Sequence, residues 1–149
     1  MRSTAHTDPV LTQSGCSSTA VRALQISIAA DKALVAEVRH TVRTALESWG
    51  ASVIADDMAV VASELASNAL KHAGSEASVR LRLSEGQALL EVDDSSMQRP
   101  VARRVGAEVE EGRGLFLVQA LAAEWGWRYR EDGGKTVWAS LPVPAGSAA

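Results

Sequence analysis

The sequence predicts an α/β fold of the α+β kind, a two-layer sandwich in which helices cover one face of a mostly antiparallel, mixed sheet. Three observations predict it. The 149 residues are one domain's length and can bury a sizeable core. The hydrophobic period switches between about 2 and about 3.6 residues, which gives the order β-α-α-β-β-loop-α-β-β. The strands follow one another as hairpins, which favours antiparallel pairing with the helices layered on one face.

The two ends of the chain differ in composition from its middle. Residues 1–20 are rich in Ser and Thr and carry no hydrophobic period, which predicts a disordered leader. Apolar patterning begins at Val21 and continues to Pro142, so we expect a folded domain over residues 21–143. The small residues that dominate 144–149 predict a flexible tail.

The composition argues against several classes of protein. A net charge of −3 with scattered basic residues argues against a nucleic-acid groove. Cys16 is the single cysteine, which excludes an intramolecular disulfide and a cysteine metal cluster. His6, His40 and His72 lack the spacing of a zinc site. With no signal-like segment and no apolar run of membrane-spanning length, we expect a cytoplasmic protein that contacts neither membrane nor nucleic acid.

The first half of the folded part predicts one strand and two helices. Residues 21–29 combine β-branched residues with partial alternation, which is typical of a strand. Asp31 is a suitable N-cap for the next helix, and Gly50 is a suitable stop. A longer helix is expected over residues 55–74. Its apolar side chains fall on one arc at helical spacing, namely Met58, Val61, Ala62, Leu65, Ala66, Ala69 and Ala73.

One edge of that arc is polar and is the first candidate for chemistry. Glu64 and Asn68 lie one above the other, in line with Asp57 and Lys71 and with His72 nearby. A carboxylate and a carboxamide beside a core are unfavourable unless they meet a partner. A hydrated divalent cation, a phosphate-bearing ligand or an attacking hydroxyl would each supply one. A solvated helix edge is the simpler alternative.

The second half predicts four strands, a long loop and a helix. Two strands separated by turn residues are followed by a stretch without period, and loops of such length are usually functional or mobile. A helix and a closing hairpin complete the chain. We expect the strands at 79–83, 88–93, 125–129 and 135–141, the loop at 94–112 and the helix at 113–124.

Three further features follow the Glu64 and Asn68 pair along the chain. Asp94 ends a strand and could accept a hydrogen bond from an exocyclic amine such as that of adenine. Glycines at Gly112–Gly114, at the start of a helix, let the backbone approach a phosphate. Thr136, just before the last strand, offers a hydroxyl to a base or to a bridging water. Each feature is weak alone, but their order and spacing together form a stronger signal.

In this order the motifs resemble those of a known family. ELASNALKHA, VDDSS, EGRGLFLV and GGKTVWASLP are similar to the N, G1, G2 and G3 boxes of the GHKL (histidine-kinase-like, Bergerat-fold) ATPases. The branch that they resemble contains the bacterial anti-sigma-factor serine/threonine kinases. The resemblance covers roughly Val21 to Pro142 and implies a Bergerat-type ATP-binding fold.

The resemblance implies roles for the candidate residues. Asn68 would bind the Mg²⁺ that bridges the phosphates of ATP, since an amide oxygen is a hard, neutral ligand. Glu64 would act as general base or orient the attacking hydroxyl or water. Asp94 would bind the adenine amine, and Thr136 would lie near the adenine. Gly112–Gly114, with the loop before them, would form a lid over the phosphates.

Other residues leave alternatives open. Lys71 or Arg113 could reach a phosphate as a point charge or as a fork. Ser96 stands where the family has a glycine, which bears on nucleotide affinity. Because Asp93 precedes Asp94, the choice of the base-binding carboxylate depends on strand register. His72, at a helix end, is a cap or a buried group as readily as a functional one.

The resemblance implies an ATP-binding regulator with Mg²⁺ as its cofactor. Such a protein transfers the ATP γ-phosphate to Ser or Thr of an antagonist protein and holds a sigma factor inactive. Homodimers are common in the family, so we expect one. The alternative is a protein-interaction module of the same fold that binds ATP only structurally or not at all. A free-standing ATPase would need only water in place of the protein hydroxyl.

Overall fold

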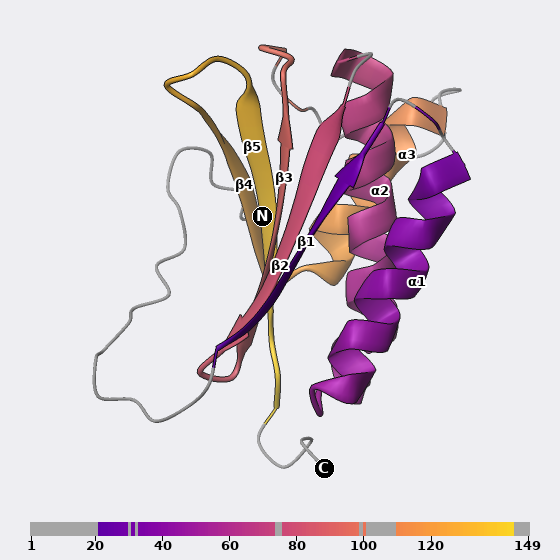
Figure 1. The fold of residues 1–149 in the computed structure, drawn as a ribbon, viewed down its shortest axis with the longest axis vertical. Coiled ribbons are helices and arrows are strands. Elements are labelled where there is room, and N and C mark those ends of the chain that lie inside the picture. Colours follow the sequence, from indigo (N-terminus) through magenta and orange to yellow (C-terminus); the bar gives the residue numbers. More distant parts are fainter. Residues whose placement is uncertain are drawn as a thin grey trace.

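The computed structural model describes residues 21–29, 31, 33–73, 76–98, 100 and 110–144. The predicted leader and the predicted tail beyond Pro144 lie outside the described residues. The elements are β1 (Arg22–Ile28), α1 (Ala33–Ser48), the 3₁₀ turn η1 (Ser52–Ile54), α2 (Ala55–Ala73), β2 (Ala77–Ser84), β3 (Gln87–Asp94), α3 (Glu110–Leu121), β4 (Glu124–Tyr129) and β5 (Lys135–Pro142). The sheet forms one layer and the helices the other (Figure 1). The predicted α+β two-layer fold is confirmed.

The sheet is five-stranded, with the order β1-β2-β3-β5-β4. All its pairings are antiparallel, so the described sheet has no parallel pair. The strands β3 and β5 are neighbours although α3 and β4 lie between them in the chain. This crossover brings the last strand beside the centre of the sheet, and it places the end of β3 next to the start of β5.

The core lies between the sheet and the helices. Alternate residues of β3 point into it, so Ala88, Leu90 and Val92 join the buried cluster. The apolar arc predicted for α2 is buried from Met58 to Ala69. It packs on the sheet beneath α2 and against α1 and α3 at its sides.

The ends of α1 follow the predicted signals. The backbone N–H of Ala33 donates to Asp31 Oδ1 at 2.9 Å, which is an N-cap hydrogen bond. Gly50 has a φ of 84°, and the N–H of Ala51 donates to the carbonyl of Leu46 at 2.8 Å. A left-handed glycine that ends the helix and satisfies its last carbonyls is the C-terminal arrangement that the sequence predicts.

Two local features differ from the predictions. The helix α3 begins at Glu110 and ends at Leu121, earlier at both ends than the predicted 113–124. Gly112 has low helix propensity and the prediction started directly after it, yet the helix includes Gly112 as well as Gly114. The turn η1 between α1 and α2 was not predicted.

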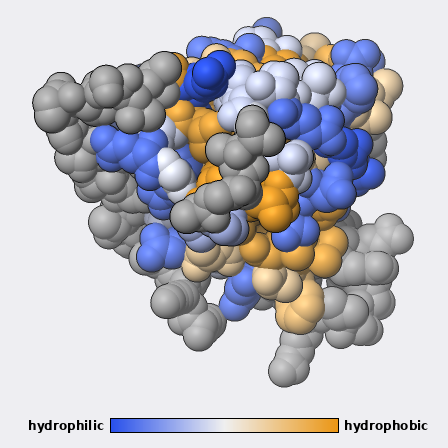
Figure 2. All heavy atoms as spheres, turned by 90° about the horizontal axis from the view of Figure 1, so that it is seen from below, coloured by the Kyte–Doolittle hydropathy of each residue, from blue (hydrophilic) through white to orange (hydrophobic). Residues whose placement is uncertain are grey.

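The surface at the lower end of the molecule is mixed. Seen from below, apolar side chains gather in the middle of this end and extend to the lower edge of the view, with hydrophilic ones on both sides (Figure 2). No helix in the described ranges is long and apolar enough to span a membrane.

Candidate functional site

The C-terminal part of α2 and the paired ends of β3 and β5 lie at one end of the sheet. The last residues of β3 and the first of β5 are paired, with Asp93 opposite Thr136 and also opposite Ser78 of β2. Because β2 begins shortly after Ala73, the C-terminal end of α2 lies at this same end (Figure 1). The polar edge of α2 and the end of β3 therefore belong to one region of the molecule.

The predicted polar edge of α2 lies beside α3. Ser63 Oγ faces α1 and accepts a hydrogen bond from Arg39 Nη2 at 3.2 Å. Glu64 and Asn68 lie about 100° and 140° further around the helix, on the side where α3 packs. Both side chains are half-buried, and Lys71 is exposed one turn beyond Asn68.

Glu64 and Asn68 are unpartnered within the part of the chain that the structure describes, since neither side chain makes a hydrogen bond or ion pair there. Half-buried polar groups without a protein partner are suited to bind a ligand. They have already lost part of their hydration, so a hydrogen bond or metal bond to the ligand costs little further desolvation energy. The residues fit a magnesium nucleotide. An amide oxygen suits Mg²⁺, which takes one or two protein oxygens and completes its shell with phosphate and water.

At the end of β3, Asp94 forms a buried ion pair with the first residue of β5. Lys135 Nζ donates to both carboxylate oxygens of Asp94, each at 3.1 Å. The backbone N–H of Ser96 donates to Asp94 Oδ1 at 2.8 Å. Asp94 is 4% exposed and Lys135 is 2% exposed. Sequence reasoning missed Lys135. No local pattern marked it, because its partner Asp94 lies 41 positions earlier in the chain.

Thr136 lies on the other face of the sheet. Its hydroxyl donates to Asp93 Oδ1, and Asp93 also accepts from Arg80 Nη2 at 2.9 Å. Successive residues of a strand point to opposite faces, so Asp94 shares the helix-covered face with Val92, and Thr136 does not. This register makes Asp94 the carboxylate on the helix side. It also separates Thr136 from the residues with which the prediction grouped it.

A glycine allows β3 and β5 to approach closely at this end. Gly134 has a φ of 90°, and a Cβ built there would lie 2.2 Å from the carbonyl oxygen of Asp94. Its N–H donates to Met97 Sδ at 3.2 Å, and the carbonyl of Met97 accepts from Tyr129 Oη at 3.0 Å. The segment after β3 is therefore folded back against the start of β5, where the Asp94 and Lys135 pair is buried.

Gly112 and Gly114 lie within the first turns of α3 rather than before it. The first N–H groups of a helix have no partner inside the helix, so a phosphate at this end would meet free donors and the positive end of the dipole. The side chains of Arg113 and His72 lie outside the described residues, and the loop predicted over 94–112 is described only at its two ends.

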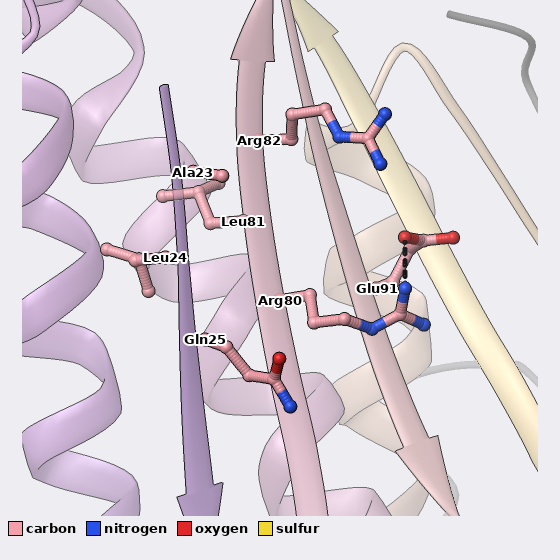
Figure 3. Close-up of a pocket in the computed structure, with 7 residues that line it drawn as sticks. All are labelled: Ala23, Leu24, Gln25, Arg80, Leu81, Arg82 and Glu91. Atoms are coloured by element: carbon pink, nitrogen blue, oxygen red, sulfur yellow. Dashed lines mark hydrogen bonds and ion pairs between the residues drawn. The ribbon is translucent and has the colours of Figure 1, made fainter. Parts of the chain in front are cut away.

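A separate cavity lies on the face of the sheet away from the helices (Figure 3). It has a volume of about 310 Å³ and contains none of the predicted site residues. Its lining is Ala23, Leu24, Gln25, Arg80, Leu81, Arg82 and Glu91. The Glu91 carboxylate forms ion pairs with Arg80 at 3.0 Å and with Arg128 at 3.2 Å, so this face of the sheet carries an ion-pair network. The alternation of Arg80 and Arg82 was its only sequence signal.

Comparison with known proteins defines the class. Residues 28–141 match the model of the histidine kinase-like ATPase domain, and the chain therefore belongs to that family. The match spans the fold from the end of β1 to the end of β5 and includes every predicted site residue. A comparison with curated proteins gives no significant match. The domain is thus of an ATP-binding class, and family members usually bind ATP with Mg²⁺.

Proposed function

We propose that this chain is a cytoplasmic ATP-binding regulator of the anti-sigma-factor type. It transfers the γ-phosphate of Mg·ATP to a Ser or Thr hydroxyl of an antagonist protein, and it binds and inactivates a sigma factor. The observation that carries the proposal is the half-buried and unpartnered pair Glu64 and Asn68 on the α3 side of α2. The N-box and G2-box resemblance supports this branch of the family.

The proposed chemistry needs few groups. Phosphoryl transfer is mostly positioning and electrostatic stabilisation. Asn68 would hold Mg²⁺ at the phosphates, and Glu64, one turn earlier, would accept the proton of the attacking hydroxyl. Lys71 and the N-terminal end of α3 would stabilise the phosphate charge.

The test has two arms. Calorimetric titration measures ATP affinity with and without Mg²⁺, and transfer from γ-labelled ATP to a candidate antagonist measures catalysis. We expect Glu64→Ala to abolish transfer while ATP binding is retained, and Asn68→Ala to weaken both. Asp57→Ala, on the same edge of α2, is a matched control and should change neither. Equal transfer by the native chain and Glu64→Ala would remove Glu64 from the mechanism.

A non-catalytic interaction module is the second candidate, and one observation favours it. The carboxylate that would bind adenine is buried in an ion pair with Lys135. Absence of Mg²⁺-dependent ATP binding at millimolar concentration would favour the module. Light scattering of the purified chain tests the expected homodimer in either case.

A further inference from the structure

We propose that Lys135 locks Asp94, so that the base end of the nucleotide pocket does not select for the 6-amino group of adenine. The inference rests on the proposed nucleotide binding. It concerns only what the base end of the pocket recognises, and it makes Lys135 the residue that determines base specificity.

The first step is the occupancy of the carboxylate. An ionised carboxylate has about four acceptor positions. Lys135 Nζ takes one on each oxygen of Asp94, and the N–H of Ser96 takes a second on Oδ1. One position remains, on Oδ2. Because Asp94 is 4% exposed, a base can reach that position only if a neighbour moves.

The second step compares the two donors. Lys135 is an ammonium, whereas the adenine amine is neutral. A charged hydrogen bond is roughly twice as strong as a neutral one, and burial of the pair increases the difference. The amine therefore does not displace Lys135 from Asp94.

The third step concerns the groups that would have to move before a base could reach Asp94. The segment after β3 donates to Asp94 through the N–H of Ser96, and Gly134 and Tyr129 hold this segment through Met97. Arg130 Nη1 donates to the carbonyl of Lys135 at 3.0 Å and to that of Asp94 at 3.3 Å. The backbone on both sides of the ion pair is thus tied together, and Lys135 is not a surface side chain free to swing away.

Removal of the ammonium should convert Asp94 into a base-binding group. In Lys135→Met the carboxylate keeps its bond from Ser96 but loses its counter-ion, so a donor from the ligand becomes favourable. A hydrogen bond to a charged group corresponds to about a tenfold gain in affinity or more. That gain should depend on the 6-amino group.

The experiment compares Mg·ATP with the magnesium complex of purine ribonucleoside triphosphate, which lacks the 6-amino group. We expect the native chain to bind both within about twofold, and Lys135→Met to prefer ATP by about tenfold or more. Lys135→Arg, which keeps the positive charge, should show no such preference. Unfolding of Lys135→Met should be measured with and without ATP, because loss of one buried partner is destabilising and ATP should restore part of the stability.

The native chain alone can overturn the inference, whether or not the variants fold. A tenfold preference of the native chain for ATP over the analogue would show that the amine is already recognised. A folded Lys135→Met that binds ATP and the analogue with the same ratio of affinities as the native chain would also overturn the inference. Binding of neither triphosphate by either protein would overturn the proposed nucleotide binding itself, and this inference with it. Binding of ATP by Lys135→Met and not by the native chain would also overturn the inference, because it requires the native chain to bind both triphosphates.

Discussion

Gly134→Ala should destabilise the fold more than the same change at its neighbour. Both glycines have positive φ, 90° at Gly134 and 100° at Gly133. An alanine in this region costs about 1–2 kcal/mol from backbone strain. At Gly133 nothing lies within 4 Å of the added Cβ, so strain is the whole effect. Gly133→Ala is therefore a matched control.

At Gly134 a second cost is added. The new Cβ would lie 2.2 Å from the carbonyl oxygen of Asp94, and that atom is backbone. The start of β5 must then move away from the end of β3, and overpacking of this kind costs about 1–3 kcal/mol. We expect a total loss of about 2–5 kcal/mol for Gly134→Ala, against about 1–2 kcal/mol for Gly133→Ala.

Urea unfolding of the two variants and the native chain measures the free energies. Thermal unfolding should agree, since 1 kcal/mol corresponds to about 2–4 °C in a chain of this size. Equal destabilisation of the two variants would refute the reasoning, because it would mean that the close approach of β5 to β3 has no energetic consequence.

Other predictions follow from burial and charge. Leu65→Ala, at a core position 2% exposed, should lower the free energy of unfolding by about 2–5 kcal/mol in urea titration, and no loss would contradict the packing of α2 on the sheet. Glu91→Gln should destabilise by more than a surface substitution, about 1–3 kcal/mol, because it removes the buried negative charge that Arg80 and Arg128 both contact, and an unchanged unfolding midpoint would refute this. Lys71→Met should weaken Mg·ATP binding in calorimetry by a few-fold, with a salt dependence smaller than that of the native chain. Equal affinities at low salt would exclude Lys71 from the phosphate end.

The sequence was informative where local chemistry decides the structure. Hydrophobic periodicity located α2 and its buried arc, and cap residues located the ends of α1 at Asp31 and Gly50. Each of these depends on residues within one or two helical turns. The family motifs then identified the class of domain, which the family comparison confirms.

The rest depended on contacts between distant residues. The position of Thr136 relative to Asp94 is set by the register of β5 on β3, and a shift of one residue exchanges the two faces. The same register made Lys135 the partner of Asp94, which local pattern does not reveal. Helix α3 includes Gly112 and Gly114 although glycine has low helix propensity, so local preference did not give its first residue.

The crossover between β3 and β5 has a consequence for synthesis and folding. Asp94 and Lys135 are 41 positions apart, and β5 is synthesised after the other described strands. Until it arrives, one edge of β3 lacks its hydrogen-bonding neighbour and is a template for aggregation. A nascent or truncated chain that ends before residue 135 therefore lacks both the neighbour of β3 and the Lys135 partner of Asp94.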